Sequence, residues 1–238
     1  MINLGSAGNF AVLGGTSVTN TGDTIIVYGN VGVSPGGTIT GFPPGVVNGT
    51  IDTGGSIAAQ AQTDLTNAYN AAAGEVAPPA NTAGTLTYFS TTLMPGVYSA
   101  SSTIDITGTL TLNGNGVYIF QAGSTLTAEV GSQVILTNGA QANDVFWQVG
   151  SSATILGGST AFEGTVLALT SITVTSGVTM TGNLLAQSGT VTLDSDNITA
   201  VPEPACTSIL IAGFMGLAIG AGRIRRHYSN RKLDSKGC

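Results

Sequence analysis

Residues 145–200 read VFWQVGSSATILGGSTAFEG, TVLALTSITVTSGVTMTG and NLLAQSGTVTLDSDNITA, three segments of one repeating pattern. Each segment opens with a short apolar run, steps through Ser and Gly to a Thr-aliphatic-Thr run, and ends in a third short run of β-forming residues. The same pattern occurs at residues 117–139, where Gln121 matches Gln148, Leu169 and Gln187 at spacings of 27, 21 and 18 residues. Three short strands per repeat, with small residues at the corners, predict one turn, or rung, of a three-sided β-solenoid.

The composition fits one large β domain. Of 238 residues, 35 are Gly and only 8% are charged, against about 25% in typical domains. The hydrophobic content of 42% is ordinary, so a low charge does not indicate disorder. We therefore expect residues 1–200 to form a single domain, long enough to bury its own core.

Charge is distributed unevenly along the chain. All six basic residues follow position 222, and residues 1–200 contain ten carboxylates but no Lys, Arg, His or Cys. Nucleic-acid binding by this domain is excluded, because no side chain could neutralise phosphates. Metal sites built from His or thiolate ligands are excluded as well. Polysaccharide lyases also use β-solenoids, but they need a basic residue for catalysis, so we expect no enzyme, no catalytic residue and no cofactor.

One helix is predicted, over residues 56–73, before Gly74 and the Pro78-Pro79 pair. Its apolar residues form one stripe at helical spacing: Ile57, Ala61, Leu65, Ala68, Tyr69 and Ala72. Such a helix is about 27 Å long at about 1.5 Å per residue. Rungs stack at about 4.8 Å, so we expect the helix to cover one flank of the solenoid, parallel to its axis, beside about five or six rungs.

Several longer segments resemble a known family. They are, in chain order, FPPG (42–45), LTNAYNAAAG (65–74), LMPGVY (93–98), TGTLTLNG (107–114), VYIFQAGSTLT (117–127), NDVFWQVGSSATI (143–155), GTVLALTSITV (164–174) and GNLLAQSGTVTLD (182–194). With them, residues 2–200 resemble the ice-binding-like domain of microbial ice-binding proteins. The resemblance implies an irregular three-sided β-helix with one long α-helix packed along its side, and adsorption to ice through one flat face.

Threonine is the residue type expected on such a face. Ice presents a regular lattice of oxygen atoms, and Thr offers a methyl group and a hydroxyl on a stiff side chain. Stacked rungs would repeat these groups without the usual sheet twist. The candidate ice-binding residues lie in the second run of successive rungs: Thr125, Thr127, Thr154, Thr173, Thr190 and Thr192. The register of these residues drifts in the sequence, so no strict T-x-T ladder is expected.

The main alternative is a non-catalytic module for cell-surface or extracellular-matrix adhesion that binds polysaccharide. Phe146 and Trp147 could form a carbohydrate-stacking site, although their repeated apolar run makes at least one of them a core residue. The sequence Asp194-Ser195-Asp196-Asn197 spaces oxygen ligands as in a calcium loop. It lacks the rest of that motif, so a polar corner is favoured and no metal site is expected.

Residues 201–238 form a tail of different character. Val201, Pro202, Glu203 and Pro204 make a stiff extended break. Residues 205–222 carry no charge, and residues 223–238 contain the basic cluster, which predicts a C-terminal transmembrane helix with its basic end in the cytoplasm. The tail resembles a bacterial PEP-CTERM sorting signal, which implies an exosortase-type sorting enzyme as a partner.

The tail also predicts where the protein is found. The resemblance implies export to the cell surface or beyond, with transient anchoring in the membrane through residues 205–222. Met1 leads directly into INLGSAGNF, without the basic and apolar regions of a signal peptide. We therefore expect the true start of the protein to lie upstream of Met1.

Overall fold

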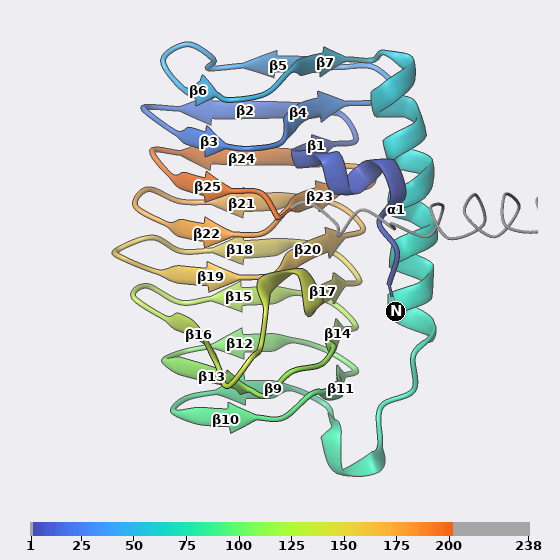
Figure 1. The fold of residues 1–238 in the computed structure, drawn as a ribbon, viewed down its shortest axis with the longest axis vertical. Helices are drawn as coiled ribbons and strands as arrows, with labels where there is room; N and C mark the ends of the chain where they lie inside the picture. The colour runs from blue at the N-terminus through green and yellow to red at the C-terminus, as the bar shows by residue number, and fades with distance from the viewer. Residues whose placement is uncertain (1, 202–238) are drawn as a thin grey trace, which may run out of the picture. The chain divides into compact units, whose positions relative to one another are not determined.

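Residues 2–201 are described by a computed structural model, in which three parallel β-sheets form the sides of a solenoid (Figure 1). Sheet A has nine strands in the spatial order β7 (Ile51–Thr53), β4 (Asn30–Val33), β1 (Phe10–Gly14), β23 (Leu184–Ala186), β20 (Thr165–Ala168), β17 (Val145–Val149), β14 (Tyr118–Ala122), β11 (Gly96–Ala100) and β8 (Thr82–Ala83). Every pair of neighbouring strands in it runs parallel, as repeated rungs predict.

The other two sheets have eight strands each. Sheet B has the order β5 (Thr38–Thr40), β2 (Ser17–Thr21), β24 (Thr190–Asp194), β21 (Ile172–Val174), β18 (Ala153–Ile155), β15 (Leu126–Ala128), β12 (Ile104–Ile106) and β9 (Leu86–Tyr88). Sheet C has the order β10 (Thr91–Leu93), β13 (Thr109–Asn113), β16 (Gln133–Thr137), β19 (Ala161–Glu163), β22 (Thr179–Thr181), β25 (Asn197–Thr199), β3 (Ile25–Val27) and β6 (Val46–Val47). Each complete rung contributes one strand to each sheet, and β7, which leads into α1, adds the ninth strand of sheet A.

The two ends of the described chain meet in the middle of the solenoid. The N-terminal rungs β1–β6 occupy one end, and α1 (Ser56–Gly74) carries the chain along the long axis to the other end, where β8–β10 begin (Figure 1). The following rungs return until β23, β24 and β25 pair with β1, β2 and β3. The short 3-10 helices η1 (Gly5–Asn9), η2 (Pro79–Asn81) and η3 (Ala142–Asp144) lie at connections.

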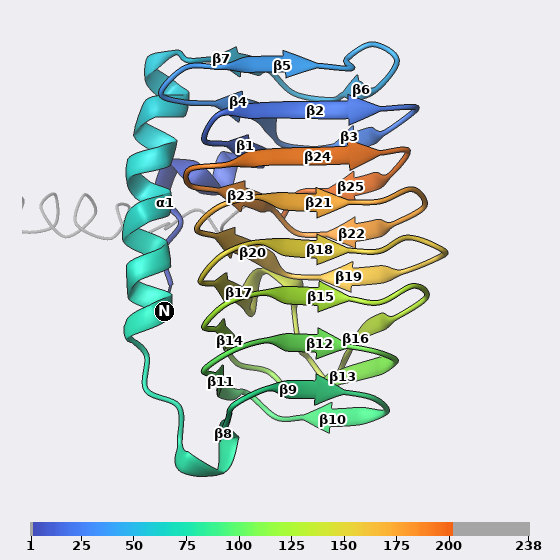
Figure 2. The ribbon, with the colours of Figure 1, turned by 180° about the vertical axis from the view of Figure 1, so that it is seen from behind.

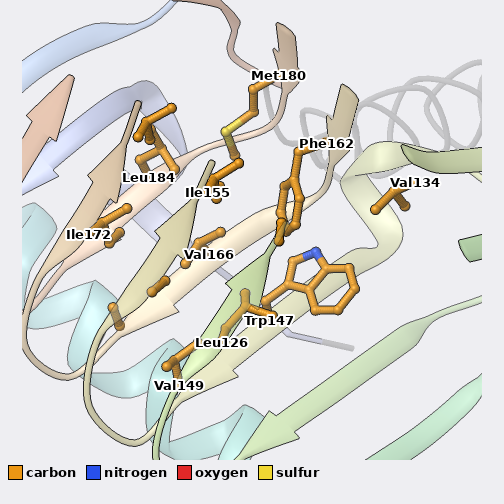
Figure 3. Packing of buried hydrophobic residues seen from close by; sticks show 14 of the residues in the cluster. Leu126, Val134, Trp147, Val149, Ile155, Phe162, Val166, Ile172, Met180 and Leu184 are labelled. Atoms are coloured by element: carbon orange, nitrogen blue, oxygen red, sulfur yellow. The ribbon is translucent and has the colours of Figure 1, made fainter. Parts of the chain in front are cut away.

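The solenoid interior is filled by apolar side chains from all three sheets. Phe120 and Trp147 stack with ring centroids 4.0 Å apart. Phe162 packs against Trp147 from β19 of sheet C, with ring centroids 5.1 Å apart (Figure 3). The Trp147 ring is fully buried, and its Nε1 donates to the carbonyl oxygen of Glu163 at 3.0 Å. Phe146 is only 3% exposed and belongs to a second cluster, between sheet A and α1. Neither ring is available to stack on a sugar.

The helix covers sheet A, as its apolar stripe predicts. Its buried residues are mostly small, which lets the helix lie close to the strands: Ala58, Ala61, Leu65, Ala68 and Ala72. It contacts strands from β7 to β14, so it extends along most of sheet A. Ile57 was expected in the stripe but is 63% exposed, because the buried face begins at Ala58. Gln62 Nε2 fixes the helix to the sheet by donating to the carbonyl oxygens of Gly14 and Ala186, each at 3.0 Å.

Gln121 on β14 holds the C-terminal end of α1. Its Nε2 donates to the carbonyl oxygens of Ala72 at 2.8 Å and of the C-cap residue Glu75 at 2.7 Å, at the helix end where α-helical donors run out. Ala72 O also accepts a long bond of 3.4 Å from Glu75 N. We expect Gln121→Ala to lower the free energy of unfolding by about 1–3 kcal/mol, because the carbonyl groups at this helix end lose the donor that the buried Gln121 side chain supplies. Urea unfolding measures this. Gln141→Ala, at an exposed position, should stay within about 0.5 kcal/mol, and equal losses for both variants would contradict the capping role.

The predicted fold class is corrected in one respect. Residues 2–201 form a mainly β protein with three parallel sheets and one α-helix, and no helix in that range is long and apolar enough to cross a membrane. The predicted transmembrane helix is therefore not part of the fold class. Its residues, 205–222, lie outside those that the structure describes.

Candidate functional site

The outward face of sheet B carries one residue type from rung to rung. The strand register aligns one outward side chain from each of its eight strands in a column: Thr40, Thr19, Thr192, Thr173, Thr154, Thr127, Asp105 and Thr87. The residues on either side of each column member point into the core, as for Ile172 and Val174 beside Thr173. We call this set the main column. Seven of its eight members are threonine.

A second column runs beside the first. It consists of the residues two positions earlier, which lie on β5, β2 and β24 or directly before the other five strands, namely Thr38, Ser17, Thr190, Ser171, Ser152, Thr125, Thr103 and Thr85. Strand pairing aligns Thr38, Ser17 and Thr190 directly. Below them, the backbone bonds from Ala153 N to Ser171 O and from Leu126 N to Ser152 O keep the column in register. This side column is Ser or Thr throughout.

The geometry of the two columns is regular. Adjacent strands lie about 4.7–4.9 Å apart, and alternate residues on one strand lie about 6.6–6.8 Å apart, so the columns form a repeating two-dimensional grid. Figure 2 shows the eight strands of sheet B stacked one above another and pointing the same way. Hydroxyls also contact one another between rungs, with Ser17 Oγ 2.9 Å from Thr190 Oγ1 and Thr19 Oγ1 3.4 Å from Thr192 Oγ1. The grid is thus both regular and partly fixed by its own hydrogen bonds.

All six threonines predicted as candidates lie on this face. The structure places Thr127, Thr154, Thr173 and Thr192 in the main column, with Thr125 and Thr190 in the side column. The expected drift in register is absent, because strand pairing brings the T-x-T and S-x-T segments into register. The ladder is still not strictly T-x-T, because Ser17, Ser152 and Ser171 take Thr positions and Asp105 interrupts the main column. Sequence reasoning also missed members from the N-terminal rungs: Ser17, Thr19, Thr38 and Thr40. Their T-I-T and S-V-T patterns match the Thr-aliphatic-Thr runs of the C-terminal rungs and could have indicated them.

The other two faces offer no comparable surface. Sheet A is covered by α1 along most of its length. Sheet C exposes branched apolar side chains as well as polar ones, among them Ile25, Ile135 and Val46, and Glu163 lies on its outward side. Burial raises the pKa of the Glu163 carboxyl, which a hydrogen bond with Thr181 partly offsets. No residue type repeats along the described strands of sheet C as Thr does along sheet B.

The Asp194–Asn197 segment forms a polar corner between sheets B and C. Asp196 is buried, and its two carboxylate oxygens accept backbone N–H groups of Val178 at 3.1 Å and Asp194 at 3.0 Å. Burial raises the pKa of the Asp196 carboxyl to about 6, against the opposing effect of these donors. Asp194 Oδ1 accepts the Ser195 hydroxyl. The carboxylates hold the corner together, and in residues 2–201 no group of three or more His, Cys, Asp or Glu residues is arranged to hold a metal.

The chain is similar to proteins of one family. The model of the ice-binding-like family matches residues 12–199. An ice-binding protein of Nostoc sp. (strain HG1) is 46% identical over 242 aligned positions, covering 98% of this chain and 88% of the relative. One from Colwellia sp. is 37% identical, with 85% of each chain covered.

Solved structures agree with the sequence matches. An ice-binding protein from an Antarctic biological consortium superimposes with a TM-score of 0.77 at 44% identity, covering 83% of this chain and 90% of the other. One from the Antarctic ascomycete Antarctomyces psychrotrophicus gives a TM-score of 0.79 at 41% identity, with 84% and 98% covered. Sequence, fold and the predicted resemblance therefore agree, and the chain belongs to the ice-binding-like family.

Proposed function

We propose that this protein binds ice through the outward face of sheet B, from β5 to β15. The observation that carries the proposal is the main column, in which Thr40, Thr19, Thr192, Thr173, Thr154 and Thr127 follow one another on six adjacent strands. Membership of the ice-binding-like family and the similarity to ice-binding proteins of known structure support it. We name these six strands the ladder segment.

The chemistry of the ladder segment suits ice rather than a charged or flexible ligand. Each Thr presents a methyl group that water surrounds without bonding strongly and a hydroxyl that can join an ordered water network. Because Cβ branching restricts χ1, little side-chain entropy is lost when the surface adsorbs. The lattice of hydroxyls would hold water in positions continuous with ice. An adsorbed molecule then blocks growth over its footprint, and ice between adsorbed molecules advances only as a curved front that melts more readily.

The alternative, a non-catalytic adhesion module that binds polysaccharide, has lost its main support. The rings of Phe146 and Trp147 are buried and cannot stack on sugars. Exposed aromatic side chains such as Tyr28 and Phe89 lie on different rungs, in the connections after β3 and β9, and form no stacking platform. Ice therefore remains the ligand that the surface fits best.

The test is direct. Purified protein, as the full chain, should shape growing ice crystals, show thermal hysteresis in a nanolitre osmometer and partition into a slowly growing ice hemisphere. The same preparation should show no retention on immobilised acidic or neutral polysaccharide. Unshaped ice at high protein concentration would refute the proposal, and polysaccharide retention would then favour the adhesion module.

We include export and sorting to the cell surface in the same proposal, because a protein must leave the cell to reach ice that forms outside it. The support is the Val201-Pro202-Glu203-Pro204 motif, which an exosortase-type enzyme would process. Detection of the protein on intact cells or in the medium tests export, and strictly intracellular protein would contradict it.

A further inference from the structure

One position interrupts the main column. Asp105 on β12 lies in register between Thr127 of β15 and Thr87 of β9, and its neighbours Ile104 and Ile106 point into the core. Its carboxylate therefore occupies the place where the rungs above present a Thr methyl and hydroxyl. Asp194, at the end of β24, lies beside the corner and outside the two columns. Within the two columns, Asp105 is the only charged member.

No cationic side chain within residues 2–201 neutralises this carboxylate. Residues 1–200 contain no Lys, Arg or His. The hydrogen bond that the structure gives Asp105 Oδ2 comes from the Thr103 hydroxyl at 3.4 Å, a long contact. An ionised carboxylate that loses its water without gaining a partner is costly. Adsorption to ice over this rung would press the carboxylate against a lattice that can offer no cation.

The shape of the Asp105 side chain also disfavours ice contact at this rung. Asp has no branch at Cβ, so it lacks the methyl group that Thr presents, and its carboxylate extends one atom further from the backbone. A group that protrudes and holds its own hydration shell breaks the grid between β15 and β9. Thr87 below it is then separated from the six threonines above.

We infer that Asp105 sets the lower limit of the ice-contact area, so that wild-type protein uses the six rungs of the ladder segment and leaves the β12 and β9 rungs out. This rests on the proposed function and adds a specificity-determining residue to it. Six rungs span about 24 Å from first to last strand and eight would span about 34 Å, at about 4.8 Å per step. The carboxylate has no structural task that competes with this role: in residues 2–201 the hydrogen bond found for it involves only Thr103.

The experiment extends the column. We expect Asp105→Thr to raise thermal hysteresis at equal protein concentration by at least about twofold, because affinity depends exponentially on the contact free energy. Asp105→Asn removes the charge but keeps the shape, so it should give an intermediate gain. Glu75→Gln, which removes one exposed charge after α1, is the matched control and should leave hysteresis unchanged. Melting temperatures are compared for all variants, since Thr is favoured over Asp in strands.

A double variant tests the boundary itself. Thr87→Ala should leave thermal hysteresis unchanged in the wild-type background, because Thr87 lies beyond Asp105. In the Asp105→Thr background it should remove part of the gain in hysteresis. Hysteresis that stays at the wild-type value in Asp105→Thr, with wild-type protein active, would overturn the boundary alone and leave ice binding intact. If neither wild-type nor Asp105→Thr shapes ice, both proposals fail. Activity that appears only in Asp105→Thr would refute ice binding by the wild-type protein and would overturn the boundary as stated, because the six rungs alone would then not suffice.

Discussion

Replacing Thr173 with lysine is expected to reduce thermal hysteresis and ice shaping to background. Thr173 lies on β21 with Thr192 and Thr154 directly above and below it, inside the ladder segment. A lysine there projects several bonds beyond the plane of the threonine methyls and carries a strongly hydrated charge. Both effects keep the neighbouring rungs away from the ice surface, so one substitution should disable the whole segment. Ice-crystal shape and hysteresis over a concentration series measure the loss.

The same rung supplies the matched control. Thr179, on β22 in sheet C, is exposed and pairs with Ala161 and Asn197. Thr179→Lys makes the same chemical change on another side of the same rung and should keep full activity. Both variants should unfold within about 0.5 kcal/mol of wild type, since both sites are on the surface. Retained ice shaping by Thr173→Lys, or equal loss in both variants, would argue against sheet B as the ice-binding face.

The architecture could be predicted from the sequence because the patterns that indicate it lie within short stretches of the chain. The apolar runs at Val145–Val149, Thr165–Ala168 and Leu184–Ala186 repeat within one stretch of chain, and each became a strand of sheet A. The helix was equally readable, since its stripe and its closing Gly74 lie within 19 residues. Only Ile57, at the first turn, was assigned to the wrong side.

The alignment of the threonines in the main column could not be predicted from the sequence, because it depends on pairing between strands that are distant in the chain. Rungs differ in length, with 27, 21 and 18 residues between equivalent positions, so an alignment by spacing makes the threonines drift. The extra residues lie in corner connections and leave the strands in register. Thr19 lies beside Thr192 although 173 residues separate them in sequence. That neighbour relation exists because α1 carries the chain to the far end of the solenoid, which no local pattern indicates.

The stacked aromatic rings in the solenoid interior are expected to contribute strongly to the free energy of unfolding. Trp147→Ala should lower the free energy of unfolding by about 3–5 kcal/mol, the usual cost of truncating a large buried aromatic side chain. The indole is fully buried, stacks on Phe120 at 4.0 Å and donates to Glu163 O, so the change removes packing, an aromatic contact and a hydrogen bond together. It also leaves the Glu163 carbonyl without that donor. Chemical unfolding followed by far-UV circular dichroism measures the loss.

Two comparisons make the Trp147 result interpretable. Trp147→Phe keeps an aromatic ring against Phe120 and loses only volume and the Nε1 donor, so it should recover more than half of the stability lost by Trp147→Ala. Phe89→Ala truncates a ring that is 71% exposed and should change stability by no more than about 0.5 kcal/mol. A loss in Trp147→Ala no larger than in Phe89→Ala would contradict a packed interior. Because Trp147 shares its rung with Thr154 of β18, the folded fraction of Trp147→Ala should still shape ice below its melting transition, which separates the role of the core from the role proposed for the outward face of sheet B.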